Sequence, residues 1–149
     1  MVLARLAVTA GEPAGVGPEL VARLAATPLA ADLVAIGDRD LLARAAARCG
    51  LRIALTDDDG APRERREPGS LRVRHVPLGA TEIPGQPDPC NAQHVLATLA
   101  EAADGCTAGR YAAVVTAPLQ KATINEAGIR FSGHTEFFAE RARADVVMM

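Results

Sequence analysis

The feature that most constrains this chain is a repeated alternation of short apolar runs with helical patterns. Four runs have the length of buried strands, namely Leu3–Thr9, Leu33–Ile36, Leu71–Val76 and Tyr111–Val115, and Leu51–Leu55 is a weaker candidate. Between them, apolar residues recur at steps of three and four, which is typical of helices that cover a sheet. Because parallel strands need long crossover connections, the alternation predicts an α/β fold with a largely parallel sheet.

Length and charge exclude several other classes of protein. The 149 residues are enough for one domain with its own core, and the net charge of −2 gives no basic footprint for nucleic acid. No apolar run is long enough to cross a bilayer. The cysteines Cys49, Cys90 and Cys106 form no C-x-x-C pair, so we expect reduced thiols and a cytoplasmic protein.

Strand, helix and reactive side chains meet after Tyr111. Thr116 and Pro118 have the residue types of a helix cap and a first helical position, and Gly128 marks a helix end. Lys121 would then lie near the start of that helix, where its ammonium and free backbone N–H groups can converge on an anion. This position makes Lys121 a candidate for binding a charged group of a substrate.

A second group of polar side chains follows at His134 and Thr135, directly after Gly133. Thr135 has the residue type that caps a helix starting at Glu136, which places His134 on the preceding turn. An imidazole and a hydroxyl at a helix start can hold a phosphorylated hydroxy compound. The plainer interpretation is that Thr135 is only a cap and His134 only a turn residue, and spacing alone favours it.

Several separated motifs resemble the 4-hydroxythreonine-4-phosphate dehydrogenase family of vitamin B6 biosynthesis. In the second half of the chain they are Thr116, Pro118, Lys121, Asn125, Ala127-Gly128 and Gly133-His134-Thr135-Glu136-Phe137. The glycine-rich block Gly11–Glu19, which follows the first strand, resembles the opening signature of the same family. The glycines of this block do not have the spacing of a dinucleotide-binding G-x-G-x-x-G loop.

The resemblance implies a three-layer α/β/α sandwich of the isocitrate/isopropylmalate dehydrogenase type. It also implies an enzyme that oxidises 4-phosphooxy-L-threonine with NAD or NADP, followed by decarboxylation to 3-amino-2-oxopropyl phosphate. The family uses a divalent metal such as zinc, magnesium or cobalt, which suits both steps. A homodimer in the cytoplasm, with no nucleic-acid or membrane partner, is expected.

Site residues are carried over only where the motifs match. In the family the His-Thr pair contacts the substrate, so this role is expected for His134 and Thr135, whereas Lys121 remains an inference from its helix position. Gln120 stands where many members have His or Asn, which leaves its role open. No residue is assigned to catalysis or to cofactor binding. His75 and His94 have no neighbours at ligand spacing and are interpreted as ordinary histidines.

Residues 1–149 are expected to be the N-terminal portion of such a subunit, because Asp145–Met149 has the pattern of a further buried strand and family members continue beyond it. Their metal-binding histidines lie in those later segments. Two alternatives remain. The chain could come from a related dehydrogenase of a threonate or erythronate phosphate or of a ring dihydrodiol, or it could be a fragment without catalytic activity.

Overall fold

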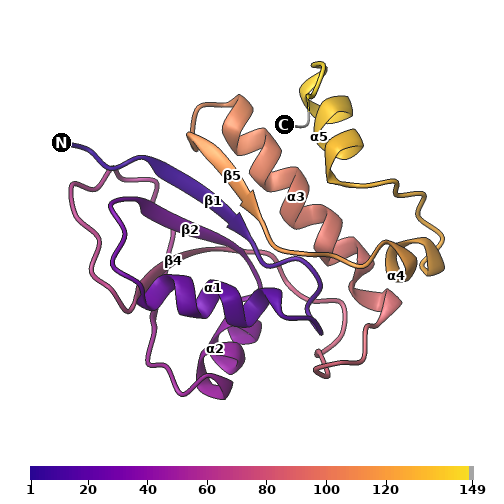
Figure 1. Cartoon of the computed structure of the whole chain (residues 1–149), viewed down its shortest axis with the longest axis horizontal. Helices are drawn as coiled ribbons and strands as arrows, with labels where there is room; N and C mark the ends of the chain where they lie inside the picture. Colours follow the sequence, from indigo (N-terminus) through magenta and orange to yellow (C-terminus); the bar gives the residue numbers. More distant parts are fainter. Residues whose placement is uncertain (148–149) are drawn as a thin grey trace.

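Five apolar segments form the strands of one sheet in the computed structural model, which describes residues 1–147 (Figure 1). The strands are β1 (Arg5–Thr9), β2 (Asp32–Gly37), β3 (Ala54–Asp57), β4 (Ser70–His75) and β5 (Ala113–Thr116). Their order across the sheet is β3-β4-β2-β1-β5, and every pair is parallel. The predicted α/β class and the parallel sheet are therefore confirmed.

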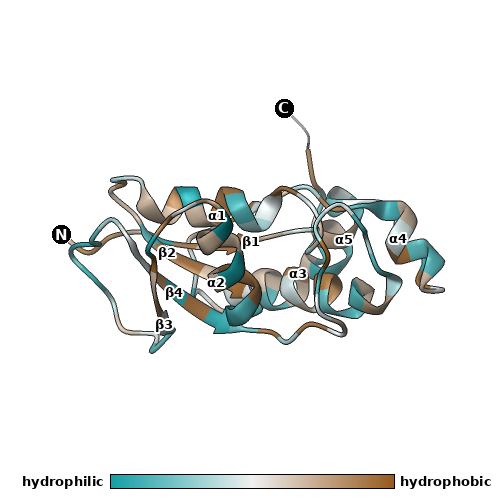
Figure 2. Ribbon diagram, turned by 90° about the horizontal axis from the view of Figure 1, so that it is seen from below, coloured by the Kyte–Doolittle hydropathy of each residue, from teal (hydrophilic) through white to brown (hydrophobic). Residues whose placement is uncertain are grey.

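Helices cover both faces of this sheet. They are α1 (Gly17–Ala26), α2 (Arg39–Arg48), α3 (Ala92–Thr107), α4 (Lys121–Glu126) and α5 (His134–Ala142), with a 3₁₀ turn η1 (Pro89–Asn91) before α3. In Figure 2, α1 lies above the strands and α3 below them, while β2 is brown, the colour of apolar residues, along its length. None of the helices within residues 1–147 is long and apolar enough to span a membrane.

Alternate residues of the central strands feed two separate cores. Val8 of β1 and Leu33 of β2 pack with Val21 of α1 on one face. Ala7 of β1 and Val34 of β2 pack with Ala102, Tyr111 and their neighbours on the α3 face. Because successive strand residues point to opposite faces, the near-continuous apolar runs of β1 and β2 are what a sheet covered on both sides requires. This arrangement is the predicted three-layer sandwich.

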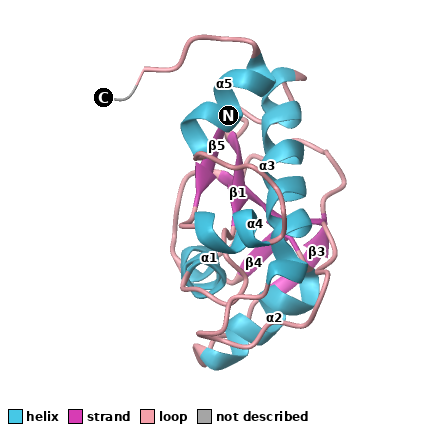
Figure 3. Cartoon of the chain, turned by 90° about the vertical axis from the view of Figure 1, so that its right-hand side faces the viewer, coloured by secondary structure: helices cyan, strands magenta, loops and turns pink. Residues whose placement is uncertain are grey.

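A third cluster attaches the last two helices to the side of α3. Val95 and Leu99 of α3 pack against Ile124 of α4 and Phe131, with Phe137 of α5 at the margin. Figure 3 shows α5 running beside the far end of α3, with α4 nearer the opposite end. The α4–α5 unit is therefore held by α3 and not by the sheet.

Two predicted helix starts were placed wrongly. Thr116 is the last residue of β5, and residues 117–120 form a loop before α4 begins at Lys121, so the strand does not pass directly into a helix. Helix α5 begins at His134, with Gly133 as its N-cap and no side-chain cap bond. Thr135 lies inside the first turn and is not the predicted cap. The chain at Pro118 accepts a tertiary bond from Glu12, which competes with local helix formation.

A buried group of charged residues lies among the strands near their N-terminal ends. Arg72 of β4 and Asp32 of β2 have side chains only 1% exposed and are joined by a 3.0 Å contact between Nη1 and Oδ2. Arg5 of β1 reaches the same carboxylate and also Asp58. Arg66 is buried too, and its guanidinium donates hydrogen bonds to carbonyl oxygens at the end of α1. Its neighbours at 64, 65 and 67 are exposed, so Arg66 is the exception in this charged segment.

The end of the chain departs from the predicted pattern. Residues 145–147 form no strand, and Val146 and Val147 are exposed. The remaining part of the predicted strand, Met148 and Met149, lies outside the described residues. Strand formation in a parallel sheet needs a paired neighbour on at least one side, and the pattern of apolar residues cannot supply that neighbour.

Candidate functional site

The strand order identifies the edge of the sheet where a ligand site is expected. Helix α1 leaves β1 on one face and α3 enters β5 from the other, so the connections diverge between these two neighbouring strands. In open parallel sheets, ligands bind outside the carboxyl ends of the strands at such a switch point. The loops that begin at Ala10 and Ala117 meet there.

These two loops are in direct backbone contact. The N–H of Glu12 donates to the carbonyl oxygen of Pro118 at 3.0 Å. A Cβ on Gly11, whose φ is +68°, would overlap that same carbonyl, so only glycine allows the approach. The glycine-rich block therefore allows the loop after β1 to pack closely against the loop after β5. The spacing of its glycines did not predict this contact.

Lys121 and the Gly133-His134 step lie side by side although eleven residues of chain separate Lys121 from Gly133. A Cβ built on Gly133 would lie 3.3 Å from Lys121 Nζ and 2.8 Å from Glu136 Oε2, so the glycine makes room for both charged groups. The segment between α4 and α5 folds back to produce this approach. The structure thus brings together two of the residues that the sequence singled out.

His134 is half-buried in the first turn of α5. Its ring lies 6.2 Å from that of Phe138 in a stacked arrangement, and its Nε2 is buried without a hydrogen-bond partner. Burial lowers the pKa of His134, and the positive charge of Lys121 lowers it further. The imidazole is therefore neutral at neutral pH and can donate or accept a hydrogen bond through the unpaired nitrogen.

Thr135 follows His134 in the first turn of α5 and is also half-buried. The first hydrogen bond at the start of α5 runs from Phe137 N to Gly133 O at 3.2 Å. The backbone N–H groups of residues 134–136 consequently have no acceptor within the helix, as at any helix start. These groups and the ammonium of Lys121 favour an anion here, whereas the carboxylate of Glu136, which also lies beside Gly133, opposes one.

Glu12 is a candidate that the sequence reasoning missed. Its side chain is buried, with 6% of the residue exposed, and Oε1 accepts a hydrogen bond from Ala14 N at 3.1 Å. Burial raises the pKa of Glu12, and the nearby charge of Asp88 acts in the same direction. A carboxyl of this kind at a switch point can take up or release a proton. The available signal was its place in the loop directly after the first core strand.

The side chains of the other two histidines form hydrogen bonds within the fold. His94 is 4% exposed, and its Nδ1 lies 3.0 Å from the carbonyl oxygen of Pro77. His75, at the end of β4, accepts a hydrogen bond at Nδ1 from Arg39 N. Within residues 1–147, no three His, Cys, Asp or Glu side chains come together as metal ligands. The described side chains therefore do not fit the divalent metal that the resemblance implies.

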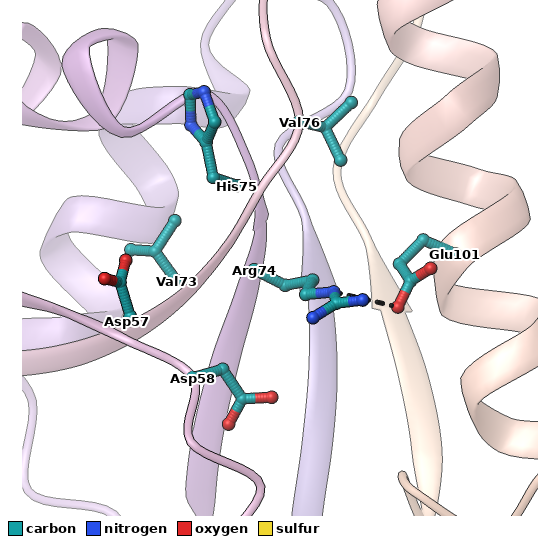
Figure 4. A pocket seen from close by; sticks show the side chains of 7 residues that line it. All are labelled: Asp57, Asp58, Val73, Arg74, His75, Val76 and Glu101. Atoms are coloured by element: carbon teal, nitrogen blue, oxygen red, sulfur yellow. Dashed lines mark ion pairs between the residues drawn. The ribbon is translucent and has the colours of Figure 1, made fainter.

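A hollow of about 350 Å³ lies beside β4 (Figure 4). Its charged groups already have partners, because Arg74 pairs with Glu101 at 3.2 Å, Asp57 with Arg39 and Asp58 with Arg5. Figure 4 shows Arg74 turned towards Glu101 and the carboxylates spread around the opening. Paired charges leave little for a ligand to neutralise, so this hollow is a poorer candidate than the Lys121–His134 region.

The sequence matches a known protein family. The family described as "Pyridoxal phosphate biosynthetic protein PdxA" matches residues 29–149. A relative from Chromobacterium violaceum, a 4-hydroxythreonine-4-phosphate dehydrogenase, is 52% identical over 145 residues. That alignment covers 97% of this chain but 43% of the relative, so the chain spans less than half the length of such proteins.

Solved structures give the same picture. The crystal structure of a 4-hydroxythreonine-4-phosphate dehydrogenase from Burkholderia phymatum superposes with a TM-score of 0.86 at 27% identity, covering 97% of this chain and 45% of that one. A terephthalate 1,2-cis-dihydrodiol dehydrogenase from Burkholderia xenovorans gives a TM-score of 0.72 at 26% identity, covering 95% and 41%. The fold is therefore shared by dehydrogenases with different substrates.

Proposed function

Because the chain belongs to the pyridoxal phosphate biosynthetic protein PdxA family, we propose that it supplies substrate-binding residues to a 4-hydroxythreonine-4-phosphate dehydrogenase. The complete enzyme oxidises 4-phosphooxy-L-threonine with NAD or NADP, and the product loses carbon dioxide to give 3-amino-2-oxopropyl phosphate. We propose further that it acts as a cytoplasmic homodimer and uses zinc, magnesium or cobalt. The metal ligands would then come from outside the described residues.

The observation that carries this proposal is the approach of Lys121 to the start of α5. Lys121 Nζ lies beside Gly133, and the adjacent His134 has an unpaired Nε2. An ammonium, a neutral imidazole and free helix N–H groups together bind an anionic oxygen by charge and by hydrogen bonds. A phosphorylated hydroxy amino acid presents such oxygens on its phosphate and on its carboxylate.

Each residue has a separate role in this proposal. His134 offers its unpaired Nε2 for a hydrogen bond to the substrate, and its lowered pKa favours the neutral ring. Thr135 offers a hydroxyl and a backbone N–H from the same turn, and Lys121 balances the negative charge. The nicotinamide accepts the hydride when it is bound, and these side chains fix the substrate in position.

Substrate titration tests the proposal directly. The chain is titrated with 4-phosphooxy-L-threonine and, as a control, with 4-hydroxy-L-threonine, while amide and histidine signals are followed by NMR. We expect the phosphorylated compound to shift the signals of His134 and Thr135, and the unphosphorylated compound to bind at least about tenfold more weakly. Equal binding of both compounds, or shifts confined to other parts of the chain, would contradict the assignment.

A second candidate function follows from the structural likeness to a dihydrodiol dehydrogenase. A neutral ring diol has no charge with which the exposed ammonium of Lys121 could pair, whereas a phosphate has. The position of Lys121 therefore favours a phosphorylated substrate. Turnover assays of the complete enzyme with 4-phosphooxy-L-threonine, an erythronate phosphate and a cis-dihydrodiol separate these possibilities.

A further inference from the structure

Asn125 joins the two ends of the segment that connects α4 to α5. Its Oδ1 accepts a hydrogen bond from the backbone N–H of Phe131 at 3.0 Å. Its Nδ2 donates to the carbonyl oxygen of the same residue at 3.5 Å. One carboxamide thus satisfies both backbone polar groups of Phe131, six residues farther along the chain.

Further contacts of this connector, residues 127–133, also fold the chain back from α4 towards α5. Gly128 N donates to Asn125 O at 2.9 Å and Ile129 N to Ile124 O at 3.4 Å, which turns the chain back at the end of α4. Phe131 is 7% exposed, and its ring centroid lies 6.1 Å from that of Phe137 in α5. The position of Phe131 therefore links the end of α4 to the first turn of α5.

We propose that Asn125 is a positioning residue, which holds this connector closed so that Lys121 and His134 face the same anionic group. The inference rests on the proposed function for the role of that anion. The geometry on which it depends is present without ligand, because Gly133 already packs beside Lys121 Nζ. Asn125 itself does not touch the substrate in this arrangement.

The two backbone groups of Phe131 explain why asparagine suits position 125. A carboxamide offers an acceptor and a donor on one short planar group, which matches the N–H and C=O of a single residue. Alanine would leave both groups of Phe131 without these partners, and the connector would gain freedom. Glutamine keeps the amide but adds a methylene, which moves the connector away from α4.

Histidine titration by NMR, on the chain as it stands, tests the proposal without any turnover. The pKa of His134 is measured in the parent chain and in Asn125→Ala, and both are titrated with inorganic phosphate. The charged groups at the start of α5 are Lys121 and Glu136. In Asn125→Ala we expect the pKa of His134 to rise towards its ordinary value, because the ring gains water and is farther from Lys121. Phosphate affinity should fall by about tenfold.

Asn91→Ala is the matched control. Asn91 Oδ1 also accepts two backbone hydrogen bonds, from Gly79 N at 3.0 Å and Ala80 N at 2.9 Å, but in the loop between β4 and α3. This variant should lose stability while the pKa of His134 and the phosphate affinity stay at the parent values. If Asn125→Ala does not fold, Asn125→Gln takes its place. We then expect a smaller rise in the pKa of His134 and a smaller loss of phosphate affinity.

Two results would overturn the proposal. One is a folded Asn125 variant in which His134 titrates as in the parent chain. The other is an equal change in Asn91→Ala, which would mean that general loosening moves the ring. If phosphate fails to perturb His134 in the parent chain, the proposed function loses its support, whereas the pKa comparison still decides the role of Asn125.

Discussion

At the scale of single residues, His134 has the environment that a neutral hydrogen-bonding group needs. We expect His134→Ala in the complete dehydrogenase to lower kcat/KM by roughly ten- to a hundredfold, because a hydrogen bond to a charged group contributes about 1.5–3 kcal/mol. Steady-state kinetics with 4-phosphooxy-L-threonine measures the change. Kinetics equal to those of the parent enzyme would remove His134 from the site.

Thr135→Ala is the companion variant. Loss of an N-cap hydroxyl costs about 1 kcal/mol, but the structure gives the N-cap position of α5 to Gly133 and shows no side-chain cap bond. A fall in kcat/KM together with an unchanged melting temperature is therefore expected. A lowered melting temperature with normal kinetics would indicate a structural role instead.

His94 makes a pH-dependent contribution to stability. Burial lowers the pKa of His94, so as the pH falls below about 6.5 the unfolded chain binds a proton that the folded chain does not. Stability should therefore fall between pH 7.5 and 5, and His134 contributes with the same sign. Asp104, whose pKa is lowered by its hydrogen bond to Arg141, acts only in more acidic solution.

Urea unfolding at several pH values measures this effect. The slope of stability against pH should be smaller in His94→Asn than in the parent chain, whatever the absolute loss of stability. The same slope in both proteins would show that His94 does not titrate differently in the folded and unfolded states.

At the scale of elements, the buried charges that join β1, β2 and β4 are a point of vulnerability. Asp32→Ala would leave Arg72 and Arg5 short of a counter-charge in a buried position, and we expect a loss of about 3 kcal/mol in the free energy of unfolding. The control is Glu67→Ala, which removes an exposed partner of Arg65 and should cost under about 1 kcal/mol. Similar losses in urea unfolding for both variants would contradict this reading of the cluster.

The sequence predicted the positions of the five strands of the sheet approximately, because apolar periodicity acts locally, but it also predicted a strand at 145–149, and residues 145–147 form none. Asp38 accepts a hydrogen bond from Leu41 N at the start of α2, as its residue type indicates, and Asp88 does the same for η1. It could not predict the start of α4 or the burial of Arg66. Both depend on contacts with segments distant in the chain, namely Glu12 and the end of α1.

In the candidate site, too, the sequence identified some residues and missed one that depends on a distant contact. His134, Thr135 and Lys121 were identified from motifs and helix position, and the structure places Lys121 beside Gly133. Glu12 was missed because its burial results from packing between two loops. No local pattern encodes that contact, since the residue types in a glycine-rich loop do not specify which other loop will cover them.

At the scale of the whole molecule, the 149-residue chain alone should show no dehydrogenase turnover and no tight metal site. A catalytic divalent metal needs about three protein ligands in fixed geometry, and residues 1–147 bring no such group together. Calorimetric titration with zinc and magnesium and an NAD reduction assay test this expectation, with the complete enzyme as positive control. Micromolar one-to-one metal binding or measurable turnover would contradict it.

The central place of β1 also has a consequence for synthesis on the ribosome. Leu6 pairs with Leu33 soon after both are made, but its other neighbour, Ala113, lies near the far end of the described chain. At about 5–20 residues per second, synthesis from Leu33 to Ala113 takes roughly 4–16 s, and β5 cannot join before then. During that interval one edge of an apolar strand is unpaired, so nascent chains of this protein should be good clients for chaperones that bind extended apolar segments.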